Sequence, residues 1–159
     1  NKRQQGEAAM KILISYNLRS KSSANALKLA KLHAQAFNAS VDVVTSADKT
    51  INEKEVPQKE EAERALWDVE EYFRQSGITC RTHFLVMGQS PGDAVIRFAK
   101  DNAVDEIVVG VDRISKLGKF VLGSLAQHII LKAPCPVLTV KATDQDFDVY
   151  LGSRSLFNT

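Results

Sequence analysis

The stretch between Gly110 and Ser124 contains the residues of this chain whose types and spacing best suit chemistry. Gly123 allows the backbone to approach a ligand closely, and Ser124 offers a hydroxyl where a helix is predicted to begin. Backbone N–H groups at a helix start attract anions. The stretch also has more basic than acidic residues: Arg113, Lys116 and Lys119 against Asp112. These features predict a phosphate-binding loop; the alternative is a solvated basic loop followed by a Gly-Ser helix cap.

Two well-known phosphate-binding motifs do not account for this stretch. Twelve residues separate Gly110 from Gly123, which is long for a connection between a strand and a helix and therefore indicates a function. A P-loop is excluded, because Arg113 stands in place of its first glycine and Phe120 in place of its magnesium-binding Ser or Thr. The dinucleotide fingerprint GxGxxG is absent after the first predicted strand.

The other residues with chemical potential are predicted to be structural. His33, His83 and His128 lack the spacing of metal ligands. Cys80 and Cys135 are far apart and form no CxxC pair, so they predict neither a disulfide framework nor a zinc site. No catalytic residue and no metal ligand is therefore assigned from the sequence.

The composition narrows the class of protein. The chain has 159 residues, enough for one domain, with 44% apolar and 25% charged residues, as in globular proteins. Its net charge of +2 argues against a protein that coats nucleic acid. No apolar run approaches the ~20 residues of a membrane span, and Asn1 to Ala9 lacks the apolar stretch of a signal peptide. We therefore expect a cytoplasmic protein that binds neither nucleic acid nor membranes.

Strands and helices are predicted to alternate along the chain. Five runs rich in strand-forming residues indicate parallel strands: residues 12–14, 41–44, 78–86, 107–109 and 137–140. Apolar runs without polar alternation, such as 12–14, support burial on both faces of the sheet. Four amphipathic helices lie between them. This pattern predicts a doubly wound α/β fold, a five-stranded parallel sheet of order 3-2-1-4-5 with helices on both faces.

Helix boundaries are indicated by capping residues. Ser22 or Ser23 can cap the first helix. That helix has apolar residues on one face: Leu27, Ala30, Ala34 and Phe37. Gly77 suits a left-handed stop after the second helix. Ser90 and Pro91 suit the N-cap and first position of the third.

In such folds, ligands bind beyond the carboxyl ends of the strands, where the strand order reverses. Residues just after the first strand, Tyr16 to Leu18, and after the fourth, from Gly110 onward, are therefore the expected site. The folded domain is predicted to span 10–141, with tails at 1–9 and 142–159.

The chain resembles the universal stress protein (UspA-type) family. Its segment from Gly110 to Val140 is similar to the C-terminal half of that domain, and Lys11 to Asn17 resembles its first strand. Gly88-Gln89-Ser90-Pro91 resembles the start of its third helix. The family's nucleotide motif is Gly, two residues, Gly, nine residues, Gly, then Ser or Thr, and Gly110, Gly123 and Ser124 match it.

Two residues depart from the family's pattern. Arg113 stands at the second glycine of the motif, where its guanidinium can pair with phosphate oxygens. Asn17 stands where nucleotide-binding members usually carry Asp, and its amide keeps an acceptor for adenine or ribose.

The resemblance implies a sensor or regulator of the stress response that binds an adenine nucleotide, ATP or AMP, with or without Mg²⁺. Asn17 and the end of the second strand would hold the base, and the glycine motif would hold ribose and phosphates. The implied binding residues are Ser15, Asn17, Val44, Ser46, Val109, Gly110, Arg113, Gly123, Ser124 and Leu125. Because no general base is positioned, at most weak ATP hydrolysis is expected.

Two alternatives stay open. One is a family member that binds no nucleotide and acts by dimerisation and partner contacts. The other is a nucleotide-activating enzyme of a related fold, which would need a phosphate-binding loop after the first strand. The residues there, Ser20 to Ser23, are polar but include no glycine.

The last strand predicts how the chain assembles. Residues 137–140 form a short apolar strand that the family's order puts at an edge of the sheet, and exposed edges invite pairing. The resemblance implies a homodimer in which Val137, Leu138, Thr139 and Val140 pair with their own copy. The alternative is a monomer whose C-terminal tail covers the edge.

Overall fold

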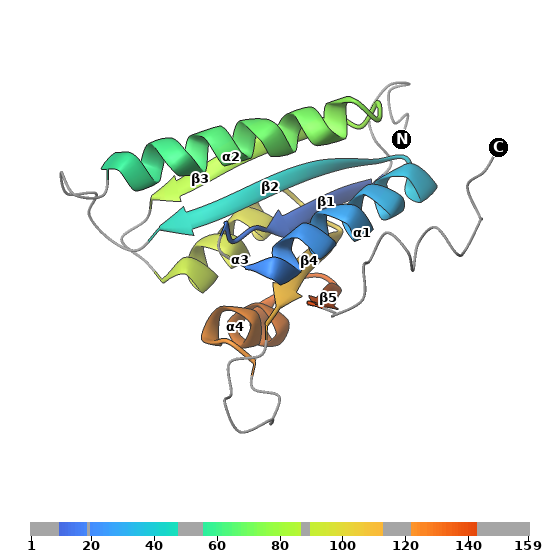
Figure 1. Ribbon diagram of the computed structural model, residues 1–159. Helices are drawn as coiled ribbons and strands as arrows, with labels where there is room; N and C mark the ends of the chain where they lie inside the picture. Colours follow the sequence, from blue (N-terminus) through green and yellow to red (C-terminus); the bar gives the residue numbers. More distant parts are fainter. Residues whose placement is uncertain (1–9, 19, 48–55, 87–89, 113–121, 143–159) are drawn as a thin grey trace.

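Strands and helices alternate through the chain, as predicted (Figure 1). The computed structural model describes residues 10–18, 20–47, 56–86, 90–112 and 122–142. The strands are β1 (Met10–Ser15), β2 (Ala39–Ala47), β3 (Cys80–Val86), β4 (Glu106–Val111) and β5 (Val137–Lys141). The helices are α1 (Lys21–Phe37), α2 (Val56–Arg74), α3 (Pro91–Asp101) and α4 (Ser124–Lys132). The predicted tails, apart from Ala142, lie outside the described residues.

All neighbouring strands are parallel, and their order is β3-β2-β1-β4-β5, which confirms the predicted fold. Helices α1 and α2 cover one face of the sheet, and α3 and α4 cover the other (Figure 1). The order reverses between β1 and β4, so the carboxyl ends of these two strands form the switch point. None of the helices in the described part of the chain is long and apolar enough to cross a membrane.

Strand β1 lies in the middle of the sheet and is buried on both faces. Ile12 and Ile14 pack among the residues of α1 and α2, whereas Leu13 packs among those of α3 and α4. All three side chains are fully buried. This explains the continuous apolar run, because each face of a central parallel strand needs an apolar residue.

Helix α3 begins and α2 ends as predicted, but α1 begins differently. The Ser90 hydroxyl accepts a hydrogen bond from the Asp93 N–H at 3.3 Å, with Pro91 in the first turn. Gly77 follows α2 with φ of +71°. The prediction that Ser22 or Ser23 caps α1 is wrong, because both lie buried inside its first turn.

The end of α1 also differs from its predicted apolar face. Ala30 and Ala34 are buried, but Phe37 is 55% exposed. Phe37 is the last residue of the helix, and Asn38 turns the chain with φ of +51°. Its ring meets the His33 ring edge-on, with centroids 5.8 Å apart, rather than packing in the core.

A buried charge joins β2 to the edge strand β3. The Asp42 side chain is 2% exposed and lies 2.9 Å from His83 Nε2 and 3.3 Å from Arg81 Nε. The His83 ring stacks at a tilt on Phe98 of α3, with centroids 4.7 Å apart. A buried carboxylate is tolerated only with such partners, so this cluster helps fix the register of β2 and β3.

The two phenylalanines Phe73 and Phe37 provide a matched test of the core. Phe73 is fully buried on the face of α2 that packs on the sheet, so Phe73→Ala should lower the free energy of unfolding by about 3–5 kcal/mol. Phe37→Ala should lower it by less than about 1 kcal/mol. Urea denaturation followed by circular dichroism measures both, and equal losses would contradict this packing.

Candidate functional site

Three predicted site residues lie level with one another across the middle of the sheet. Ser15 of β1 is in register with Val44 of β2 and with Val109 of β4. The Tyr16 N–H donates to the Val44 carbonyl at 2.8 Å and extends this pairing by one residue. The Val44 and Val109 side chains are buried in the α3/α4 side of the core, so only their backbone can face a ligand.

The turn from β1 into α1 is fixed by hydrogen bonds around Asn17. The Asn17 N–H donates to the Ser23 hydroxyl at 3.0 Å, and the Asn17 carbonyl accepts from the Ser20 N–H at 3.1 Å. Asn17 itself is exposed at the switch point. These bonds fix the backbone of Asn17 next to the carboxyl end of β1.

Gly110 lies against the first turn of α1. A Cβ at this position would be 2.5 Å from Ser22 Oγ and 2.8 Å from the Ser22 carbonyl carbon. The glycine is therefore required by the packing of α1 on β4. The sequence motif predicts only a ligand-binding role for Gly110, and the steric requirement becomes visible in the structure.

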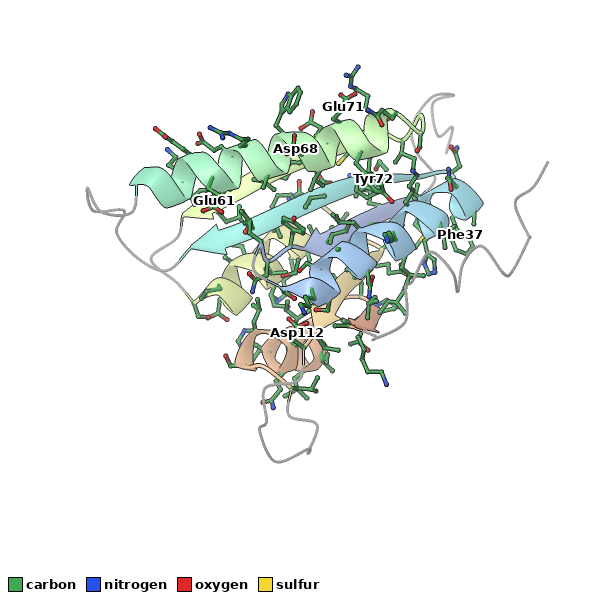
Figure 2. All side chains as sticks on the ribbon, in the orientation of Figure 1. Phe37, Glu61, Asp68, Glu71, Tyr72 and Asp112 are labelled. Carbon is green, nitrogen blue, oxygen red and sulfur yellow. The ribbon has the colours of Figure 1, made fainter. Side chains whose placement is uncertain are left out.

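Asp112 follows β4, the strand next to β1, and its side chain caps the start of α1 (Figure 2). Its carboxylate accepts a hydrogen bond from the Ser22 N–H at 3.2 Å and a second from the Ser20 hydroxyl. The two serine hydroxyls are 2.7 Å apart. Since α1 has no acidic residue in its first turn, Asp112 supplies the negative charge that a helix start favours. In the sequence, Asp112 is only the one acidic residue among the basic residues that follow β4, and nothing there indicates this role.

Helix α4 begins at the predicted residue, Ser124. Gly123 occupies the N-cap position with φ of −62° and ψ of 152°, and as a glycine it brings no side chain to the first N–H groups. Ser124 is exposed, whereas Leu125 packs against the α3/α4 side of the core. Gly123 and Ser124 thus combine open backbone with an accessible hydroxyl.

Two predicted site residues are described partly or not at all. Ser46 lies in β2 in register with Leu85, but its side chain is outside the described set. Arg113 lies outside the described residues. The other predicted site residues lie on or next to β1, β2, β4 and the start of α4, at the carboxyl ends of the strands.

A contact between Asp93 and His128 joins the first turn of α3 to the middle of α4. Asp93 lies 2.8 Å from His128 Nε2, and it also accepts a hydrogen bond from the Ser90 hydroxyl at 2.7 Å. The Ser90 hydrogen bond, followed by those of His128, keeps the pKa of the Asp93 carboxyl below its usual value. A Cβ on Gly92 would be 2.6 Å from the His128 ring, so this glycine permits the contact.

The three histidines each face a carboxylate of another element. His33 lies 2.9 Å from Glu106, and His83 and His128 meet Asp42 and Asp93. Among the residues that the structure describes, no group of three or more His, Cys, Asp or Glu could hold a metal ion.

A surface pocket of about 370 Å³ lies away from this edge, between the end of α2 and the start of β3. It is lined by Glu70, Arg74, Gly77, Ile78, Thr79 and Cys80. Burial, reinforced by Glu70 and Asp42, raises the pKa of the Cys80 thiol to about 12. The thiol stays protonated near neutral pH, so the pocket offers no thiolate nucleophile.

Strand order, helix placement and the open start of α4 define a doubly wound α/β protein with its candidate site at the β1/β4 switch point. The model of the universal stress protein family matches residues 9–141. The chain therefore belongs to the universal stress protein family.

Individual relatives agree with this assignment. A universal stress protein of Thermus aquaticus is 32% identical over 135 residues, which covers 82% of this chain and 97% of the relative. A solved universal stress protein from Archaeoglobus fulgidus has a TM-score of 0.72 and 28% identity, and covers 83% of this chain and 93% of its own. Another from Archaeoglobus fulgidus, in complex with dAMP, has a TM-score of 0.68 and 26% identity, covering 84% and 99%.

The contact between Gly110 and Ser22 can be tested by substitution. Gly110→Ala should lower the free energy of unfolding by about 1–3 kcal/mol, because the added methyl group meets backbone as well as side-chain atoms. The double variant Gly110→Ala with Ser22→Ala should stay destabilised, since the Ser22 backbone remains. Thermal and urea unfolding measure both; full recovery in the double variant would show that only the hydroxyl is in the way.

Proposed function

We propose that this chain binds an adenine nucleotide at the switch point and acts as a cytoplasmic sensor or regulator in a stress response. The observation that carries the proposal is the match of Gly110, Gly123 and Ser124 to the family's nucleotide motif. The Archaeoglobus fulgidus relative in complex with dAMP supports the same class of ligand. The functional domain of the proposal is residues 10–141.

The proposed site divides the nucleotide between two parts of the edge. Asn17, Ser15 and the end of β2 from Val44 to Ser46 would hold the base. The backbone at the ends of β2 and β4 would contact the nucleotide, because the Val44 and Val109 side chains are buried.

The glycine motif would hold the ribose and phosphates. The N–H groups at the start of α4, the Ser124 hydroxyl and the Arg113 guanidinium suit phosphate oxygens. Gly110 and Leu125 would contribute by backbone contact. AMP or ATP fits this division, and Mg²⁺ would accompany ATP. The carboxylate at this edge, Asp112, already accepts hydrogen bonds from Ser20 and Ser22, so hydrolysis would be weak at most.

The structure gives an argument against the nucleotide-activating enzyme. That enzyme would need a phosphate at the start of α1, after the first strand. The Asp112 carboxylate already accepts hydrogen bonds from Ser20 and Ser22 there. A phosphate at the same point would meet a like charge.

The nucleotide site can be tested by calorimetry with ATP and AMP at millimolar concentrations. Gly123→Val should abolish binding, because its side chain fills the path of approach. Ser124→Ala should weaken binding by about 0.5–1.5 kcal/mol, the net value of one hydrogen bond. Ser76→Ala, at the opposite edge of the sheet, is the matched control and should bind as the parent does. No heat and no thermal shift with either nucleotide in the parent protein would rule the proposal out.

We also propose a two-fold homodimer through β5. The strand lies at an edge of the sheet, and Thr139 is exposed. On the adjoining helix α4, Leu131 is 83% exposed and Ile130 is 39% exposed. Exposed apolar side chains beside a strand at the edge of a sheet are typical of an interface. A two-fold axis would pair β5 antiparallel with its copy.

Sedimentation at micromolar concentration tests this assembly. The protein should sediment as twice its 17.6 kDa mass. Thr139→Pro should shift it to the monomer, because the Thr139 N–H faces away from β4 and proline removes that donor from the free side of the strand. Circular dichroism confirms that the variant is folded. A monomeric parent protein would defeat the proposal.

A further inference from the structure

Asp112 puts a fixed negative charge at the edge of the sheet where the phosphates of the proposed nucleotide would lie. It follows β4 directly and stands two residues after Gly110, inside the stretch that matches the nucleotide motif. In Figure 2 its side chain lies between the start of α1 and helix α4. Hydrogen bonds from Ser20 and Ser22 hold it there.

We propose that Asp112 makes the site selective for a nucleotide with a single phosphate over one with three. The inference rests on the proposed nucleotide site and names its ligand class, an adenosine monophosphate. One phosphate can use the start of α4, where Gly123 leaves the first N–H groups open. Each further phosphate adds negative charge near the Asp112 carboxylate.

The helix start does not cancel this charge. The N-terminus of a helix carries roughly half of an elementary positive charge, so about half of the carboxylate's charge remains. The helix start is also no longer free to attract a second phosphate, because Asp112 accepts from the Ser22 N–H. Asp112 therefore acts in two ways, by repulsion and by occupying an anion-binding helix end.

Asp112→Asn separates this role from the structural one. An Asn side chain keeps an oxygen that can accept from the Ser22 N–H, and Asn is a good helix cap. The substitution removes the charge and puts an NH2 group where one carboxylate oxygen accepts from the Ser20 hydroxyl, and that hydroxyl can accept in its turn. Asp101→Asn is the matched control, because it also removes one negative charge. Asp101 is the exposed last residue of α3, at the end of the sheet opposite the proposed site.

Calorimetry with adenosine, AMP and ATP, each with EDTA and with Mg²⁺, provides the test. The parent protein should bind AMP more tightly than ATP. Asp112→Asn should raise the affinity for ATP by about threefold to tenfold relative to AMP, the effect of a nearby charge in a solvated site. The adenosine affinity of Asp112→Asn should change by less than about twofold. The ratio of ATP to AMP affinity in Asp101→Asn should also change by less than about twofold from the parent's. Should Asp112→Asn lose its thermal stability, Asp112→Gln, a longer uncharged side chain that also keeps an amide oxygen, replaces it.

Other results would overturn the inference. An unchanged ratio of ATP to AMP affinity in Asp112→Asn would show that the carboxylate is only a cap. If Asp112→Asn loses ATP affinity with Mg²⁺ present but not with EDTA, Asp112 binds the cation. If no nucleotide binds any variant or the parent, the proposed function itself fails. AMP binding with an unchanged ratio would refute the selectivity alone.

Discussion

The start of helix α1 packs so closely on the end of β4 that no side chain fits between them, and the rest of the site depends on this contact. Glycine is the only residue type that permits this contact at position 110, because a Cβ there would be 2.5 Å from Ser22 Oγ. The contact fixes the carboxyl end of β4 beside that of β1, where Ser15 and Val109 are in register. It also brings Asp112 within reach of the Ser22 N–H. A single missing side chain thus sets the positions of both strand ends and of the nearest charge.

A glycine in this family's motif can therefore serve the protein as well as a ligand. Gly110 relieves a steric conflict within the chain, whereas Gly123 has a φ of −62°, which any residue can adopt. Gly123 thus needs no conformational freedom, and close approach of a ligand is the role that we propose for it. Its neighbour Ser124 is exposed, in contrast to the buried serines of α1. The two ends of one motif have different physical roles.

Most of the fold could be predicted from the sequence because local signals and packing agree. Apolar runs such as residues 12–14 are continuous because both faces of β1 are covered, and Ser90 with Pro91 marks a helix start by itself. The cap of α1 could not be predicted, because its partner lies 90 residues away and only the parallel sheet brings the two together. Periodicity also failed at Phe37, since a helix's last residue lies beyond the sheet that its stripe covers. The site residues on strands follow from topology, and Arg113 stays a prediction.

The sheet divides the interior into two bodies that share no side chain. Phe73, Ile14 and Val43 belong to one hydrophobic cluster, and Leu13 and Ile129 belong to the other. Substitutions without shared partners usually have additive effects on stability. Phe73 and Ile129 lie on opposite faces of the sheet in separate clusters, so changes of volume at the two should have additive effects on stability. The α1/α2 side can therefore vary in sequence independently of the α3/α4 side, and the two halves of the core are free to evolve at different rates.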